Sequence, residues 1–167
     1  MNDLKSIVAR CGDWDLKNDN EWYTHQDRKV NSITIHPRFL ENQDYFLNDI
    51  ALIHVEKDFD LADKQAEEYL NVAPICLPAF EDVDFKEDKC VSMSWGGVPE
   101  YHVSMQQVNF SIVENKKCEG TLRRKTRLEN SFSLPSNLMC ARGEDKNNCG
   151  KEVGAPLVCQ SKKYPNR

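Results

Sequence analysis

Residues 149–159 read Cys149-Gly150-Lys151-Glu152-Val153-Gly154-Ala155-Pro156-Leu157-Val158-Cys159. A cysteine stands at each end, and the apolar run before the second one predicts a short strand over Pro156–Gln160. At the centre is Val153, whose side chain has no lone pair. Such a side chain cannot attack a carbonyl carbon or hold an acyl group. Position 153 therefore supplies no nucleophile to the loop around it.

Composition places the chain among soluble globular proteins. Of its 167 residues, 40% are hydrophobic and 29% are charged, enough for one ordinary domain with a real core. The net charge of −5 argues against a nucleic-acid or anionic-membrane partner, since both select basic surfaces. No apolar run approaches the roughly 18 residues that cross a bilayer. The start, Met1–Lys5, has no basic flank leading into an apolar run, so no signal peptide is visible.

Seven cysteines are spread along the chain without a Cys-x-x-Cys pair, which argues against a zinc ribbon or a thioredoxin-type motif. Spread cysteines are typical of a disulfide framework in an oxidising compartment, so the pattern predicts a secreted protein. An odd count leaves at least one cysteine without an internal partner. The missing signal peptide conflicts with secretion unless the true amino-terminal part is absent from this sequence.

Hydrophobic patterning predicts an all-β protein. Gln107–Val113 alternates apolar and polar residues, as a half-buried strand does, and Ile50–Val55 has the apolar run of a buried strand. Further predicted strands are Ser6–Cys11, Lys29–Ile35, Leu138–Ala141 and Pro156–Gln160. Two helices are predicted, over Leu61–Leu70 and over Asn115–Leu122, the second carrying Cys118. Many short strands with few helices favour a β-sandwich or a pair of β-barrels.

Five segments together resemble the trypsin/chymotrypsin family, in that family's order. They are Asn48–Leu52, Pro74–Pro78, Cys90 with Ser94-Trp95-Gly96, Leu138–Ala141, and the loop around Val153. The resemblance implies a double Greek-key β-barrel that is incomplete here. It assigns residues 1–72 to the end of the first barrel, 73–89 to a linker, and 90–167 to most of the second barrel.

A narrower resemblance is to arthropod clip-domain serine protease homologues. It rests on Gly12–Asp15, His25–Arg28, Ile33–Pro37 and the basic insertion Leu122–Leu128. Members of that subgroup often lack the nucleophile and serve as cofactors in cascades such as melanisation. The resemblance implies a secreted, catalytically inactive homologue that acts by binding other proteins, such as cascade proteases or their substrates, and not nucleic acid or membrane.

The family resemblance also assigns catalytic positions. Asp49 matches the triad aspartate and Val153 the nucleophile. The resemblance implies that Asp49 is buried, whereas an ordinary aspartate beside a strand would bond to local backbone. None of the four histidines lies in the family's histidine motif, so His25, His36, His54 and His102 are predicted to be structural or surface residues.

Neighbouring positions depart from the family pattern as well. Lys151 stands where the oxyanion loop has a glycine, and a side chain there restricts close backbone approach. Glu152 stands at the aspartate that pairs with the cut amino terminus, keeping its charge but adding a methylene. Asn147 stands at the base of the specificity pocket, where an amide weakens binding of arginine or lysine. These changes predict that the whole cleft has lost its catalytic function.

The resemblance implies Cys90–Cys159 and Cys118–Cys140 disulfides, although sequence alone leaves other pairings open. Asp13, Asp15, Asp19 and Glu21 occupy the place of the family's calcium loop and offer the hard oxygens that Ca²⁺ prefers; the alternative is a solvated acidic loop. No other cofactor is predicted. Asn109 begins an Asn-Phe-Ser glycosylation sequon within a predicted strand. Arg123–Arg127 is a dense basic run that either docks an acidic partner or is a solvated loop.

Two other hypotheses remain. One is an active trypsin-like endopeptidase whose sequence is incomplete or misassembled. The other is a fragment that does not fold alone, because an open barrel leaves unpaired strand edges. A serine codon at position 153 would support the first, and the lack of a cooperative melting transition would support the second.

Overall fold

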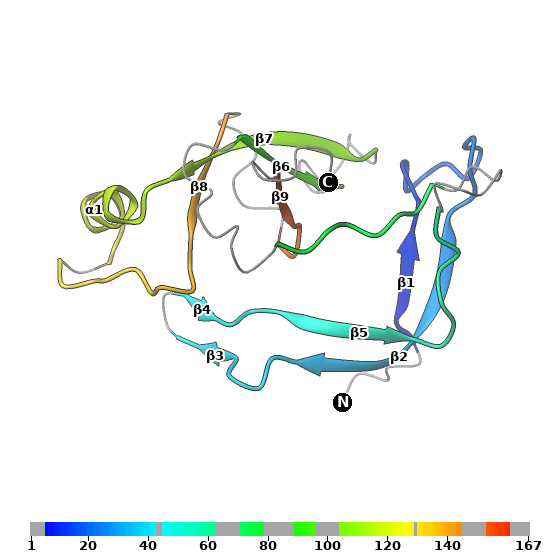
Figure 1. Cartoon of the computed structure of the whole chain (residues 1–167), viewed down its shortest axis with the longest axis horizontal. Coiled ribbons are helices and arrows are strands. Elements are labelled where there is room, and N and C mark those ends of the chain that lie inside the picture. The colour runs from blue at the N-terminus through cyan, green and yellow to red at the C-terminus, as the bar shows by residue number, and fades with distance from the viewer. Residues whose placement is uncertain are drawn as a thin grey trace. The chain divides into compact units, whose positions relative to one another are not determined.

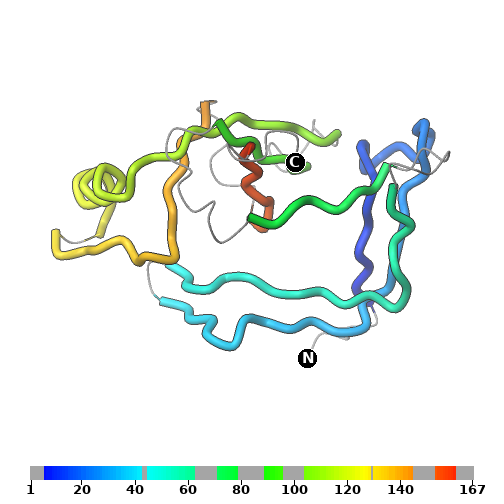
Figure 2. The backbone as a smooth tube through the Cα atoms, viewed as in Figure 1, coloured from blue at the N-terminus to red at the C-terminus, as the bar shows by residue number. Residues whose placement is uncertain are grey.

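The structure is a computed structural model, and it describes residues 6–42, 45–62, 71–78, 89–95, 104–128, 130–144 and 153–160. The chain divides into two compact units, Met1–Ile75 and Cys76–Arg167. The division falls inside the segment 73–89, which the family resemblance assigns to a linker. Each unit has a β-sheet of its own, as the path of the backbone shows (Figures 1 and 2). The C-terminal unit also holds the helix of the described chain, α1.

Three antiparallel strands form the sheet of the N-terminal unit. They are β1 (Val8–Cys11), β2 (Gln26–Ile35) and β5 (Ala51–Val55), in the order β1-β2-β5. In the register, Cys11 lies opposite Gln26, and Ile35 lies opposite Ala51. The register of β2 on β5 shifts between Val30 and Ser32, just after the residues that pair with β1 end at Lys29. The three strands confirm the predictions for this part of the chain, with small differences at their ends.

A two-stranded hairpin links β2 to β5. Its strands are β3 (Leu40–Glu41) and β4 (Phe46–Leu47). The rings of Phe39 and Phe46 stack with their centroids 6.2 Å apart. No hydrophobic period can be read from strands of two residues, which is why the sequence did not predict them.

The prediction that Ile50–Val55 is buried is wrong. Ile50, Leu52 and Ile53 expose 64%, 63% and 57% of their surfaces. A strand is buried only when a second layer covers its sheet. In the described part of the N-terminal unit the backbone of β5 pairs with β2, and its side chains are left to solvent. The single buried apolar side chain described in this unit is that of Val30, at 3% exposed.

The sheet of the C-terminal unit has four antiparallel strands in the order β8-β7-β6-β9. They are β6 (Lys89–Ser94), β7 (Gln106–Val113), β8 (Cys140–Gly143) and β9 (Leu157–Cys159). The alternation predicted for Gln107–Val113 is confirmed, because Val108 is buried while Asn109 and Ser111 are exposed. Cys90 and Ser92 of β6 are buried, with 1% and 5% of their surfaces exposed. The described core of this unit therefore lies where β6 pairs with β7 and β9.

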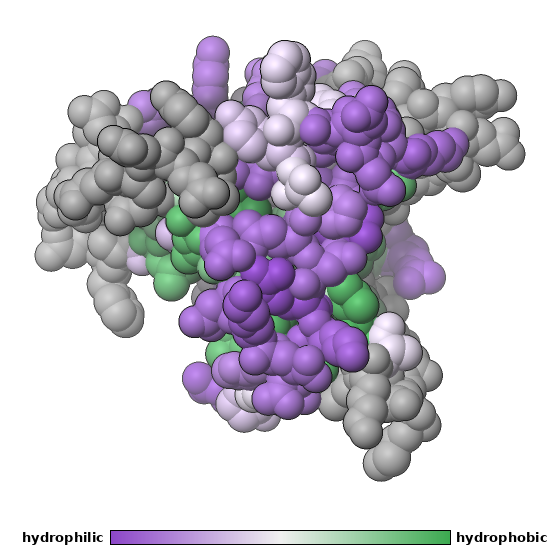
Figure 3. Space-filling model, turned by 90° about the vertical axis from the view of Figure 1, so that its right-hand side faces the viewer, coloured by the Kyte–Doolittle hydropathy of each residue, from purple (hydrophilic) through white to green (hydrophobic). Residues whose placement is uncertain are grey.

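The helix α1 (Asn115–Lys125) follows β7 and confirms the helix predicted over Asn115–Leu122, three residues longer. Most of the helix predicted over Leu61–Leu70 lies outside the described residues. A mostly strand structure with one short helix confirms the all-β class. Polar residues dominate the face drawn in Figure 3, with smaller apolar areas between them. No helix in the described segments is long and apolar enough to cross a membrane.

Candidate functional site

Val153 lies in the turn that leads into β9. Its side chain is 96% exposed. The next residue, Gly154, has a φ of 86°, in the left-handed region that glycine adopts without a Cβ clash. Behind the turn, β9 pairs with β6, and the Cys90–Cys159 disulfide joins the two strands where these residues face each other. The turn therefore presents position 153 fully to solvent, and the side chain there is a hydrocarbon without a nucleophilic atom.

The other predicted cleft positions in this loop, Asn147, Lys151 and Glu152, lie outside the described residues, as does Cys149. Their expected roles remain predictions.

Asp49 lies between the β3–β4 hairpin and β5. The preceding Asn48 has a φ of 52°, and its side-chain nitrogen, Nδ2, donates a hydrogen bond to the backbone carbonyl oxygen of Arg38 at 2.6 Å. The amide of His36 donates to the carbonyl oxygen of Ile50 at 3.0 Å and closes the same loop. Asp49 itself is exposed. The expectation of a buried carboxylate at this position is wrong in the described structure, because the sheet beside it has no covering layer among the described residues.

Three of the four histidines are described, all in the N-terminal unit. The Nδ1 atom of His25 lies 3.9 Å from a carboxylate oxygen of Asp19. His36 uses its Nδ1 atom to accept a hydrogen bond from the amide of Arg38 at 3.1 Å. His54 is an exposed residue of β5. These surroundings agree with structural or surface roles, and His102 lies outside the described residues.

The acidic loop uses its carboxylates to hold its own backbone. Glu21 accepts hydrogen bonds from the amides of Trp14 at 3.1 Å and Asp15 at 2.6 Å. Asp13 is 4% exposed and its Oδ2 atom lies 3.2 Å from Arg10 Nη1. No group of three or more His, Cys, Asp or Glu side chains suited to a metal forms among the described residues. Protein donors already occupy three of the four carboxylates, since the Asp15 carboxylate also accepts from the amide of Lys17 at 3.0 Å. The proposed calcium ligands therefore form no set that fits Ca²⁺ among the described residues.

Arg10 also holds Asp27 across the β1–β2 pair. Its Nε and Nη2 atoms donate to the two carboxylate oxygens at 2.7 and 2.8 Å, a two-point contact that sequence patterns did not reveal. The hydrogen bonds from Arg10 lower the pKa of Asp27.

We expect this pair to make stability depend on acid. A carboxylate with a lowered pKa in the folded state contributes stability above its unfolded pKa of about 3.9 and loses it as the pH falls toward the folded value. Asp27→Asn should therefore flatten the fall in the urea midpoint as the pH is lowered from about 5 to about 2, by a small amount because the pair is exposed. Asp58→Asn, an exposed carboxylate of the same unit, is the control. An equal acid dependence in wild type and Asp27→Asn would contradict this prediction.

The described cysteines form the two disulfides that the resemblance implies. Cys90–Cys159 closes 69 residues and Cys118–Cys140 closes 22. Among the described residues, Cys11 and Cys76 are free thiols, and burial raises the pKa of Cys11.

Asn109 projects from the exposed side of β7. Its side-chain nitrogen donates to a carboxylate oxygen of Glu144 at 3.1 Å, and the amide of Glu144 donates back to the Asn109 carbonyl oxygen at 3.0 Å. Glycosylation at this position remains a prediction, and a glycan on this nitrogen would have to displace the bond to Glu144.

Comparison with known proteins agrees with this architecture. The family model described as Trypsin matches residues 2–164. Phenoloxidase-activating factor 2 of Galleria mellonella is 33% identical over 161 residues, covering 93% of this chain and 50% of that protein. Inactive CLIP domain-containing serine protease A28 of Anopheles gambiae is 31% identical, with 93% and 39% covered. The chain thus spans half or less of the length of these two relatives.

Solved structures support the same fold. Mouse neuropsin, a serine protease of the limbic system, superposes with a TM-score of 0.67 at 23% identity, covering 91% of this chain and 61% of that one. The fold is therefore the all-β fold of trypsin-like proteases, present here in part.

Proposed function

The chain belongs to the trypsin family, and from that premise we propose that it is a catalytically inactive homologue that acts by binding other proteins, as a cofactor or regulator of a protease cascade. The observation that carries the proposal is Val153. Peptide hydrolysis in this family needs a nucleophile at this position, a base within hydrogen-bond reach and an orienting carboxylate. A hydrocarbon side chain removes the first requirement outright.

The other family positions support inactivity independently. Lys151 stands where the oxyanion loop of the family has a glycine, and Asn147 stands at the position that sets specificity. In a serine protease, loss of the nucleophile alone costs a factor on the order of 10⁶ in turnover. The changes at Lys151 and Asn147 also alter positions on which another route to peptide hydrolysis in this cleft would depend.

The relatives support a role through binding. Two of them, A28 and A8 of Anopheles gambiae, carry the word inactive in their names, and a third is named a phenoloxidase-activating factor. That third name supports a melanisation-type cascade as the setting we propose. The disulfide framework supports an extracellular location.

The proposal is tested with the full-length natural product, its disulfides formed, incubated with a panel of peptide substrates that differ in the residue before the scissile bond. We expect turnover no higher than the buffer blank, while an active trypsin-family protease at the same concentration cleaves its substrate. Turnover that co-purifies with the protein and is abolished by a serine-directed inhibitor would overturn the proposal and favour the endopeptidase alternative.

A further inference from the structure

The helix α1 concentrates positive charge in an acidic protein. Residues 114–127 hold six Lys or Arg and two Glu, a formal charge of +4, so the remainder of the chain must carry −9 to give the net −5. Five of the six cations are exposed, and four of these five lie within the helix: Lys116, Lys117, Arg124 and Lys125. We call these four the basic stripe.

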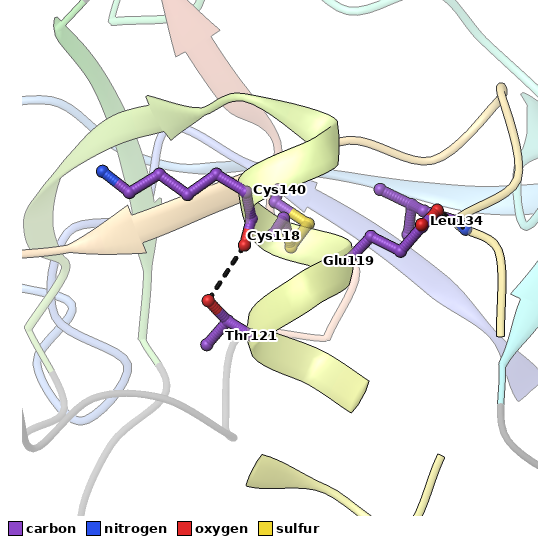
Figure 4. The surroundings of a disulfide bond; sticks show 6 residues. Cys118, Glu119, Thr121, Leu134 and Cys140 are labelled. Carbon is purple, nitrogen blue, oxygen red and sulfur yellow. Dashed lines mark hydrogen bonds between the residues drawn. A yellow bond between two sulfur atoms is a disulfide. The ribbon is translucent and has the colours of Figure 1, made fainter. Parts of the chain in front are cut away.

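The helix contributes no buried side chain to a core. It is attached instead through discrete bonds (Figure 4): the Cys118–Cys140 disulfide ties it to β8, and a Glu119 carboxylate oxygen accepts from the amide of Leu134 at 2.8 Å. On the next turn, Arg123 Nε donates to the carbonyl oxygen of Phe132 at 2.6 Å. Such attachment fixes the helix while leaving its outer face uncovered by the described residues.

The basic stripe includes charges that do not help the helix form. Cations in the last turn suit the negative end of the helix dipole, but Lys116 and Lys117 lie in the first turn, where the dipole favours anions by about 0.3–1 kcal/mol. No acid lies in that turn, and the N-cap residue, Glu114, makes no side-chain capping bond. Helix stability therefore does not account for the two lysines.

Three of the four stripe residues, Lys116, Lys117 and Arg124, follow one side of the helix, and Lys125 lies at the edge of that side. Lys117 and Arg124 are seven residues apart and share a face, and Lys116, Gly120 and Arg124 follow at intervals of four. A Cβ at Gly120 would lie 3.6 Å from Arg124 Nη1, so the guanidinium lies back over the glycine toward the first turn. The stripe runs for about 12 Å from Lys116 to Arg124.

We propose that the basic stripe is a docking surface for an acidic segment of a partner protein. This inference rests on the proposed function, in which the chain acts by binding other proteins. It adds that one of these proteins presents carboxylate side chains. Carboxylate side chains complement exposed ammonium and guanidinium groups. The length of the stripe fits a short acidic stretch, whereas a long polyanion would continue onto a chain whose remaining charge is −9 and be repelled there.

The test uses a fluorescein-labelled oligoglutamate peptide as the probe, with an oligoglutamine peptide and heparin as the other arms. The full-length protein is compared with the variant K116Q/K117Q/R124Q/K125Q. A matched variant, K17Q/K29Q/R38Q/K57Q, removes four exposed cations from the N-terminal unit. Circular dichroism and the melting midpoint establish that both variants fold like wild type.

We expect the stripe variant to lose at least about tenfold in affinity for oligoglutamate at about 0.01 M salt, and wild-type binding to weaken at about 0.15 M because salt screens exposed charges. The matched variant should stay within about twofold. Carbodiimide, which joins carboxylates to amines in contact, should link the peptide to Lys116, Lys117 or Lys125. Equal losses in both variants, an unchanged stripe variant, or heparin binding more tightly than the peptide through the same residues would overturn the proposal. The readout is binding, so peptide hydrolysis by the protein would refute the proposed function without touching this result.

Discussion

Val153→Ser is expected to leave peptide hydrolysis at the level of the buffer blank. A serine hydroxyl is a weak nucleophile until a base accepts its proton, so a hydroxyl at position 153 does not by itself restore catalysis. In subtilisin, removing the serine or the histidine alone costs about as much as removing all three triad residues, on the order of 10⁶ in turnover. Lys151 adds a side chain where the oxyanion loop needs close backbone approach.

The measurement is turnover of the substrate panel by the full-length product carrying this substitution. Val153→Ala is the matched control, since it shortens the side chain without adding a hydroxyl. Because the side chain at 153 is 96% exposed, both variants should unfold within about 0.5 kcal/mol of wild type. Turnover that appears with serine and not with alanine would show that the rest of the cleft is intact and that the loss of function is confined to one residue.

Removing the Cys90–Cys159 disulfide is expected to produce the largest loss of stability. Closing 69 residues lowers the entropy of the unfolded chain by an amount worth about 4 kcal/mol, compared with about 3 kcal/mol for the 22 residues closed by Cys118–Cys140. Cys90 is also 1% exposed, so its replacement disturbs the packing of β6 against β9. Cys118 lies on a helix without buried residues and has less packing to lose.

The experiment compares urea unfolding of C90A/C159A with C118A/C140A, since paired alanines leave no orphan thiol in either. We expect the first variant to be less stable than the second by at least about 1 kcal/mol. Its midpoint of unfolding should therefore lie at a lower urea concentration. A smaller loss for C90A/C159A than for C118A/C140A would contradict the assignment of the β6–β9 contact as the centre of the C-terminal unit.

Local patterns predicted the strands and the helix well. The alternation in Gln107–Val113 specifies both the strand β7 and its buried face, since period two is a property of the sequence itself. A short helix is predicted over Asn115–Leu122, and α1 forms there. The disulfide pairs came from the family resemblance, because spacing alone does not choose among pairings.

Features that depend on contacts between residues far apart in the chain could not be predicted from the sequence. The Arg10–Asp27 pair joins residues seventeen positions apart and is set by the register of β1 on β2. The burial expected for Ile50–Val55 and Asp49 failed for a related reason. An apolar run indicates that its side chains are suited to burial under a second layer of structure. It does not indicate whether the described residues provide that layer.

The central claim is that position 153 offers no covalent nucleophile, and intact mass tests it most directly. The full-length product is incubated with a fluorophosphonate, which phosphonylates the activated serine of working serine hydrolases, alongside an active trypsin-family protease. The account predicts that the active protease gains the mass of one adduct while this protein's mass is unchanged. A stoichiometric adduct on this protein that maps to a residue in its cleft would show that a working nucleophile exists there, and the claim of inactivity would be wrong.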